Sequence, residues 1–244
     1  MLLIDADITC FSSCSGAQEE IEWDPETWSY YFDFTKAKKS FQWWLDKVID
    51  QAGISEFKLC YTGPDNFRKV INPSYKGNRG KKPVGYSALK EWSKEVYPFF
   101  EKPQLEADDC MGILATRFPG KAFPATMDKD LLTIPGRMLH LNQKLEARWV
   151  DSNEKDGNRQ FLMQALMGDA TDGYGGCPGI GPKTAEKLLD KHGTVWKTVV
   201  DAYVKAGLTE EDALMNARMA RILRAEDWDF EKNEVKLWTP SRPV

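Results

Sequence analysis

The chain has 244 residues, of which 42% are hydrophobic, and its 33 basic and 37 acidic side chains give a formal net charge of −4. Two aspartates in the opening MLLIDADI are unlike a signal peptide, and no apolar run approaches a membrane span, so we expect a soluble cytoplasmic protein without a membrane partner. Five cysteines without a C-x-x-C pair and only two histidines argue against disulfides and zinc sites.

The first part of the chain shows strands separated by helices. Short apolar runs predict strands at Leu2 to Ile4, Phe57 to Tyr61, 121 to 127 and 137 to 141. Apolar residues at helical spacing predict helices at Thr35 to Ala52, Val84 to Phe99 and Ala107 to Phe118. This alternation favours an α/β fold with a mostly parallel sheet that is flanked by helices.

After Val150 the pattern becomes mostly helical. Helices are predicted at Arg159 to Met167, Pro182 to Lys191, Val195 to Ala206 and Glu210 to Arg224. The polar segment from Ser152 to Asn158 is predicted to connect the two regions of the chain. We therefore expect an α/β core over residues 1–155 and a C-terminal helical region over residues 156–244.

A basic segment, NFRKVINPSYKGNRGKK, lies between the second predicted strand and the next core helix. Its six cations, without any acid, are Arg68, Lys69, Lys76, Arg79, Lys81 and Lys82, and Tyr75 lies among them. Interleaved cations and aromatic rings are a common means of holding single-stranded nucleic acid. Proline and glycines interrupt any helix here, so we expect a mobile arch over residues 66–83. A solvated surface loop is the alternative.

Acidic residues are grouped at predicted strand ends and helix starts. The groups are Asp5; Glu106, Asp108 and Asp109; Asp128 and Asp130; and Asp169 and Asp172. In doubly wound sheets ligands collect beyond the carboxyl ends of the strands, so the groups at Asp5 and Asp128 should converge. Acids in a first helical turn also serve as caps, which is the structural alternative for Glu106 to Asp109.

The combination of these groups favours a metal site. Carboxylates that are packed together repel one another unless a cation neutralises them. Hard oxygen ligands suit Mg²⁺ or Mn²⁺, and two such ions are a standard device for displacement at phosphorus. The sequence therefore predicts a metal-dependent enzyme that acts on a polyanion.

The stretch GGCPGIGPKTAEKLL, from Gly175 to Leu189, differs by one residue from a phosphate-binding P-loop, because Pro182 stands where the lysine belongs. A helical segment precedes it, so it is interpreted as a hairpin between helices, over about residues 160–191. Backbone N–H groups and a helix start can grip DNA phosphates. The candidate contacts are Gly176, Gly179, Gly181, Lys183 and Thr184. A purely structural turn is the alternative.

Six stretches together resemble a known family. LLIDAD, NFRK, YKGNR, LEADD, MDKDLL and GDATDGYGGCPGIGPKTA occur in the order seen in the flap endonuclease and 5′-exonuclease superfamily, whose fold is PIN-like. The match spans Leu2 to about Leu189. Chain length, NPSYKGNRGKKPVGY and MARILRAEDWDF resemble the stand-alone 5′-exonucleases of short-tailed bacteriophages.

The resemblance implies roles for these residues. Asp5, Glu106, Asp108 and Asp128 would supply most ligands of a first ion or of its water shell, with Asp109, Asp130, Asp169 and Asp172 nearer a second. Lys76 and Arg79 would reach the scissile phosphate, acting in catalysis with Asp5, Asp128 and Asp130, and Tyr75 would stack on a nucleotide. The C-terminal region would carry a helix-three-turn-helix motif, whose loop carbonyls are candidates for binding K⁺.

One position departs from the family pattern. The family usually has an aspartate just after the second strand, where this chain has Thr62 and Gly63. Asp65 lies nearby, only two residues before Phe67. Whether Asp65 replaces the missing carboxylate is a question for the structure.

The sequence therefore predicts a 5′-nuclease with two Mg²⁺ or Mn²⁺ ions that cuts at or near a 5′ end, flap or nick of DNA, including RNA-primed ends, and leaves 5′-phosphates. If the chain is phage-encoded, it would act in the host cytoplasm during DNA replication or recombination. Three alternatives are a nucleotide kinase or NTPase with Lys183 as its P-loop lysine, a non-catalytic structure-specific DNA-binding protein, and an RNA-cutting PIN nuclease.

Overall fold

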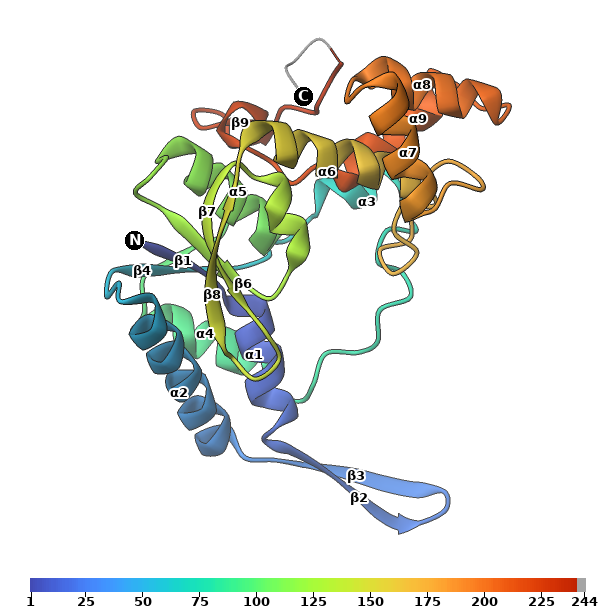
Figure 1. Cartoon of the computed structure of the whole chain (residues 1–244). Helices are drawn as coiled ribbons and strands as arrows, with labels where there is room; N and C mark the ends of the chain where they lie inside the picture. Colours follow the sequence, from blue (N-terminus) through green and yellow to red (C-terminus); the bar gives the residue numbers. More distant parts are fainter. Residues whose placement is uncertain (241–244) are drawn as a thin grey trace.

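A six-stranded sheet forms the centre of the structure, a computed structural model that describes residues 1–240 (Figure 1). Its strand order is β5-β4-β1-β6-β7-β8. The strands are β1 (Leu2–Asp5), β4 (Phe57–Cys60), β5 (Phe99–Phe100), β6 (Phe123–Thr126), β7 (Gly136–Leu141) and β8 (Ala147–Ser152). All neighbouring pairs are parallel except β7 and β8. The predicted mostly parallel sheet is confirmed.

Alternating side chains of β1 build a core on each face of this sheet. Leu2 and Ile4 join one buried cluster, and Leu3 joins the other. Helices α1 (Ala6–Ser15), α2 (Phe34–Ala52) and α4 (Tyr86–Val96) cover the first face, and α5 (Ala107–Arg117) covers the second. Helices on both faces leave the carboxyl ends of the strands as the open edge, which is where ligands bind in such sheets.

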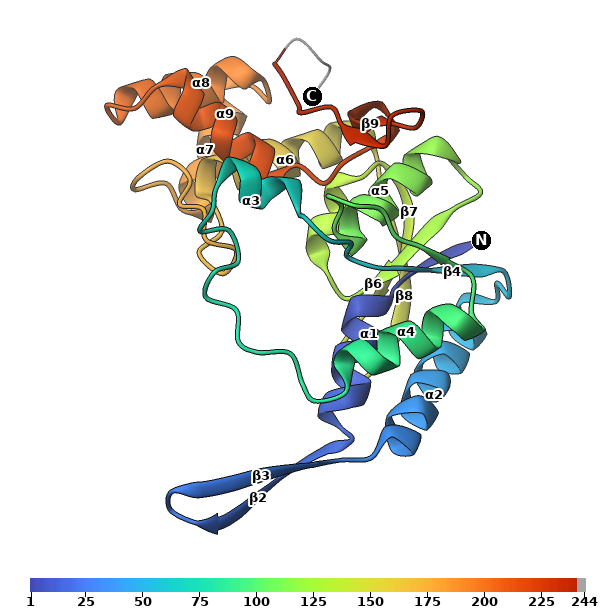
Figure 2. The same ribbon diagram turned by 180° about the vertical axis from the view of Figure 1, so that it is seen from behind.

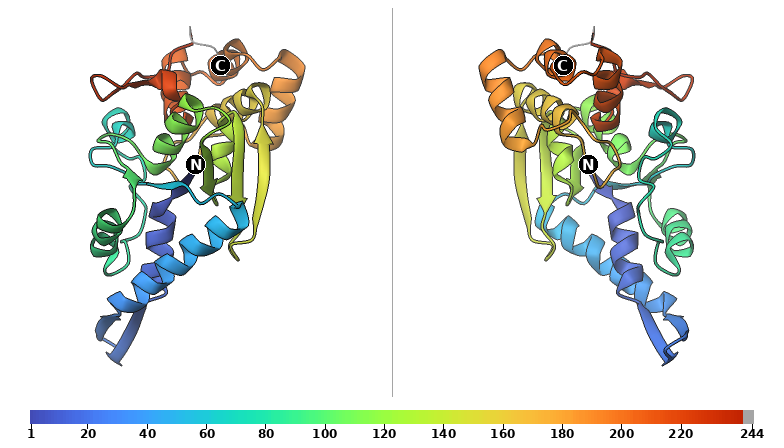
Figure 3. Two further views of the ribbon diagram at one scale, coloured as in Figure 1. Left: turned by 90° about the vertical axis from the view of Figure 1, so that its left-hand side faces the viewer. Right: turned by 90° about the vertical axis from the view of Figure 1, so that its right-hand side faces the viewer.

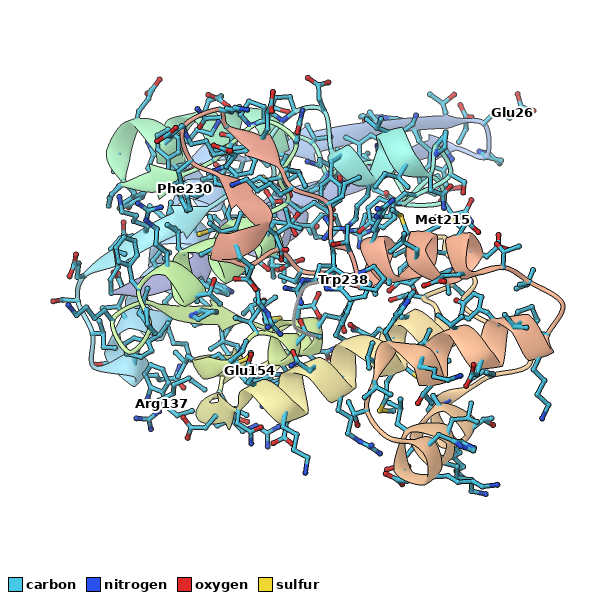
Figure 4. All side chains as sticks on the ribbon, turned by 90° about the horizontal axis from the view of Figure 1, so that it is seen from above. Glu26, Arg137, Glu154, Met215, Phe230 and Trp238 are labelled. Carbon is cyan, nitrogen blue, oxygen red and sulfur yellow. The ribbon has the colours of Figure 1, made fainter. Side chains whose placement is uncertain are left out.

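The C-terminal region is a group of helices with its own buried cluster. It contains α6 (Glu154–Met167), α7 (Pro182–His192), α8 (Trp196–Lys205) and α9 (Glu210–Ala220). The ring of Trp238, labelled in Figure 4, packs edge-on against Phe161 of α6 and Trp196 of α8. Between α9 and Trp238 the chain returns to α5 through η2 (Ala225–Asp227), β9 (Trp228–Asp229) and β10 (Glu234–Val235). This return attaches the helical region to the sheet.

Several elements differ from the prediction. The helix expected up to Phe99 ends at Val96, because Tyr97 precedes a proline and is extended. The helix expected up to Arg224 ends at Ala220. Elements not predicted include α1, β8, the 3₁₀ helix η1 (Lys129–Thr133), and a hairpin of β2 (Gln18–Asp24) and β3 (Thr27–Phe32).

The basic segment begins with a short helix, α3 (Phe67–Ile71), that packs on α9. From there the chain passes through turns at residues 73–78 and then crosses, extended, to the start of α4, as Figure 2 shows from behind. In residues 1–240 no helix is long and apolar enough to cross a membrane.

Candidate active site

Six carboxylates line one cavity of about 290 Å³ beside the carboxyl ends of β1 and β6. They are Glu106, Asp108, Asp128, Asp130, Asp169 and Asp172. They come from the start of α5, from the segment after β6, and from the loop after α6. The acids that the sequence grouped separately therefore lie together in space.

Asp5 ends β1 behind this cavity and is 4% exposed. Its carboxylate caps α1 by accepting from Ile8 N, and it also accepts from Thr126 Oγ1 at 3.1 Å. Burial, followed by the charge of Asp7, raises the pKa of Asp5 to about 7. A cation placed beside such a carboxyl would favour its ionised form.

Two cavity acids also have raised pKa values. Desolvation, together with the charges of Asp5 and Asp128, raises the pKa of Asp108 well above its usual range. Desolvation and the charge of Asp128 likewise raise the pKa of Asp130 to about 7. The donor set is entirely oxygen, which suits hard divalent ions. Within residues 1–240, however, no three acid, His or Cys side chains already enclose an ion site.

The ammonium group of Lys76 occupies the position of a cation in this cavity. Its Nζ lies 2.5 Å from Glu106 Oε1 and 3.5 Å from Asp172 Oδ2, while Arg79 pairs with Asp172 at 2.8 Å. Burial opposes the charge on Lys76, but Glu106 and Asp172 outweigh it and raise the pKa of Lys76. The cavity therefore accepts positive charge, as a metal site must.

Arg68 belongs to the protein interior, contrary to its expected contact with phosphate. Its side chain is 3% exposed, and its guanidinium donates to both oxygens of Asp109, at 2.7 and 2.8 Å. It also donates to the carbonyl oxygens of Met219 and Arg221. Asp109, expected near the second ion, is 0% exposed and is held by this guanidinium. Arg68 and Asp109 together join α3, α5 and the end of α9.

Glu106 connects this interior pair with the cavity. Arg68 reaches Glu106 Oε2 at 3.0 Å, on the side opposite Lys76. Burial alone would raise the pKa of Glu106, but Arg68 and Lys76 outweigh it and hold its pKa at about 2. Tyr75 was expected to stack on a nucleotide, but it is 3% exposed and donates its hydroxyl proton to Glu106 and Asp172. Tyr75 therefore orients carboxylates.

A second cavity, of about 420 Å³, adjoins the first through Lys76, Arg79 and Glu106. Lys69 and Lys82 line it, whereas Lys81 is exposed outside its lining. Phe11 of α1, which sequence reasoning missed, also lines this cavity with 49% of its surface exposed. The available signal was its position in the sequence: Asp5 ends an apolar strand, and Phe11 follows six residues later.

Asp7 is a second residue that sequence reasoning missed. Its carboxylate accepts from the backbone N of Thr62 at 3.1 Å and from the hydroxyl of Tyr86 at 2.7 Å. Asp7 thus brings a carboxylate from α1 to the end of β4, where the family pattern has an aspartate. Asp65 is exposed and lines neither cavity.

The glycine-rich loop joins α6 to α7, and its glycines have two different tasks. The N–H of Gly176 donates to Asn216 Oδ1, and a Cβ there would lie 2.3 Å from Gly168 N, so Gly176 holds the loop closed. Its N–H is therefore not free for phosphate. Gly179, Gly181, Lys183 and Thr184 are exposed at the start of α7.

Known proteins are similar to this chain, some in sequence and others in fold. The exonuclease of Escherichia phage T7 is 30% identical, and the alignment covers 98% of this chain and 93% of that protein. The exodeoxyribonuclease of Enterobacteria phage T3 has the same identity and coverage. A bacteriophage T5 flap endonuclease, solved with DNA and metal ions, superposes with a TM-score of 0.64 at 17% identity, over 91% of this chain and 88% of that one.

No protein-family model matches the sequence. The family is instead shown by relatives that match the chain almost from end to end, and the phage T5 structures share its fold. This chain belongs to the flap endonuclease and 5′-3′ exonuclease superfamily.

Proposed function

We propose that this protein is a divalent-metal-dependent 5′-nuclease that hydrolyses phosphodiester bonds at or near the 5′ end of duplex or flapped DNA. One observation carries the proposal: six carboxylates and the two cations Lys76 and Arg79 face one cavity at the carboxyl ends of the strands. Its phage relatives are named exonuclease and exodeoxyribonuclease, and the T5 flap endonuclease was solved with DNA and metal ions.

Two Mg²⁺ or Mn²⁺ ions fit the carboxylates of the cavity. Asp5, Glu106, Asp108 and Asp128 are assigned to one ion, directly or through water, and Asp130, Asp169 and Asp172 to the other. Asp109 is left out because Arg68 holds both of its oxygens. Bound ions would supply an activated water and stabilise the leaving oxygen. Carbonyls of the loop before α7 are the proposed site for K⁺.

Lys76 and Arg79 are assigned to the scissile phosphate. Both now neutralise carboxylates that divalent ions would take over, which frees the two cations for a substrate phosphate. Positive groups aimed at the developing charge stabilise the transition state. These two residues stand where the acidic cavity meets the second cavity.

The second cavity is assigned to a single strand of the substrate, and the glycine-rich loop to its duplex. Phe11 offers an exposed ring for a base, and Lys69 and Lys82 offer charges for phosphates of a single strand. Gly179, Gly181, Lys183 and Thr184 would hold a duplex backbone. Flapped, nicked and RNA-primed 5′ ends are the proposed substrates, met inside the host cell as for the phage relatives.

A duplex with a 5′ flap, labelled separately at each end, tests this function. With Mg²⁺ the wild type should release short 5′ products, whereas EDTA should abolish release. Asp130→Asn should slow release by at least about 10²-fold, because the substitution removes a ligand charge from the cavity. Tight DNA binding without cleavage in Mg²⁺ or Mn²⁺ would replace the nuclease with a structure-specific binding protein.

Metal binding should also change the pH dependence of stability. The pKa values of Asp5 and Asp130 rise from 3.8 to about 7 in the folded protein. Between these values the folded protein keeps protons that the unfolded chain releases, so stability falls as the pH rises towards 7 and the loss persists above it.

Ligands must be ionised to bind metal, so Mg²⁺ should raise the Tm more at about pH 8 than at about pH 5. Differential scanning calorimetry with Mg²⁺ or EDTA measures the two increments, and Asp130→Asn should shrink the one at high pH. Equal increments at both pH values in the wild type would contradict the assignment of these carboxylates to metal.

A further inference from the structure

The hairpin of β2 and β3, called the ribbon below, extends away from the sheet and helices in every view (Figures 1–3). Glu26, at its turn, lies at the outer edge of the molecule in Figure 4. Large aromatic side chains on the ribbon face solvent: Trp23 is 68% exposed, Trp28 53%, Tyr30 56% and Tyr31 55%. An isolated two-stranded hairpin is marginally stable, and exposed aromatic patches mark interaction sites.

The ribbon also carries only negative charge. Residues 18–32 contain five acids and no Lys or Arg. Glu20 lies opposite Tyr30 and Glu22 opposite Trp28, so carboxylates and rings share one face. Carboxylates beside aromatic rings resemble phosphates beside bases in their chemistry. The charge favours a cationic protein surface as the partner, since DNA phosphates would be repelled.

The base of the ribbon is attached to the chain directly after the basic segment, at the start of α4. Gln18 Oε1 accepts from the backbone N of Val84 at 2.8 Å. Gly85 packs so closely on Phe32 that a Cβ would lie 2.0 Å from the ring. The acidic ribbon and the basic arch are therefore neighbours on one face of the molecule (Figure 2). A two-fold axis through this face would place each ribbon against the arch of a second copy.

We propose that the ribbon docks on the basic arch of a second copy of this chain, forming a symmetric dimer in which it takes the place of DNA. The occupant follows from charge, because Lys69, Lys81 and Lys82 of the basic segment are exposed and residues 66–82 contain no acid. Trp28 and Tyr30 lie on the same face of the ribbon as Glu20 and Glu22, and a two-fold axis would form the contact between this face and the partner's arch twice. The inference rests on the proposed function, since the same arch would hold substrate.

Sedimentation velocity of the full chain tests this dimer without requiring metal or cleavage. The wild type should dimerise with a Kd on the order of micromolar at low salt, and added salt should weaken the association. Trp28→Ala/Tyr30→Ala should raise the Kd at least about tenfold. The matched control is Trp43→Ala on α2, an exposed tryptophan outside the ribbon, which should dimerise as the wild type does. Flapped DNA in EDTA should dissociate the wild-type dimer.

A second variant, Glu20→Lys/Glu22→Lys, tests the charge without removing the rings and should also be monomeric. Circular dichroism identifies any variant that fails to fold. A wild type that stays monomeric at low salt would overturn the proposal, as would a ribbon variant that dimerises normally. Ribbon variants that lose DNA affinity instead would make the ribbon a DNA contact. Because cleavage is not measured, the dimer can fail while the nuclease assignment stands.

Discussion

Lys76→Ala should slow single-turnover cleavage by about 10²- to 10³-fold while DNA affinity changes far less. The ammonium group lies 2.5 Å from Glu106 and lines both cavities, so it can reach a phosphate that bridges them. Its charge is secure, because Glu106 and Asp172 raise the pKa of Lys76 despite burial. One contact among many backbone contacts adds little to affinity, whereas charge that develops only in the transition state depends on the nearest cation.

Single-turnover rates and equilibrium binding, measured on the same flapped duplex, separate these two effects. Lys81→Ala is the matched control, since Lys81 is an exposed lysine of the same segment outside both cavities. It should change the salt dependence of binding and leave the cleavage rate nearly unchanged. Equal losses of affinity and rate in Lys76→Ala would make Lys76 a binding residue only.

Arg68→Met should lower the free energy of unfolding by about 3 to 5 kcal/mol, a large part of the roughly 5 to 15 kcal/mol that domains possess. The substitution leaves Asp109 buried and ionised without its bidentate partner. It also removes the donors to the carbonyl oxygens of Met219 and Arg221. Removing one member of a buried ion pair costs more than the pair contributes, because the remaining charge is uncompensated.

Urea denaturation with Mg²⁺ absent measures this loss. Arg79→Met is the control, because the Arg79 side chain is 56% exposed and its pair with Asp172 should contribute less than about 1 kcal/mol. Replacing both partners, as Arg68→Met/Asp109→Leu, should recover part of the stability. A loss below about 1 kcal/mol in Arg68→Met would contradict the interior assignment and return Arg68 to the phosphate contacts.

Periodicity predicted the central sheet and its covering helices because core side chains recur at the spacing of the element that carries them. Leu2 and Ile4 face one cluster and Leu3 the other, as alternation in a strand requires. The same rule explains why the ribbon was not predicted. Its strands have no buried face, so they lack the apolar alternation that identifies a strand in a sequence. Helix α1 was not predicted because Asp5, Asp7 and its small polar residues obscured the helical pattern.

The site was predicted in its composition and only partly in its geometry. The grouped acids meet in one cavity because parallel strands end at one edge, a rule that sequence spacing can use. The sequence assigned Arg68 to a phosphate, Tyr75 to a nucleotide and Asp109 to a metal ion, because cations, rings and acids near a site usually contact such ligands. Their burial depends on distant partners such as Met219, 151 residues beyond Arg68.

By itself the sequence determined the alternation of strands and helices in the core, the family, and the set of carboxylates and cations available for chemistry. These properties follow from local spacing and from residue type. Only the tertiary structure decided which charges lie in the interior and which line the cavities, and that the Asp7 carboxylate lies beside Thr62. The physical reason is that desolvation and ion pairing are set by neighbours brought together on folding, so identical side chains acquire different roles.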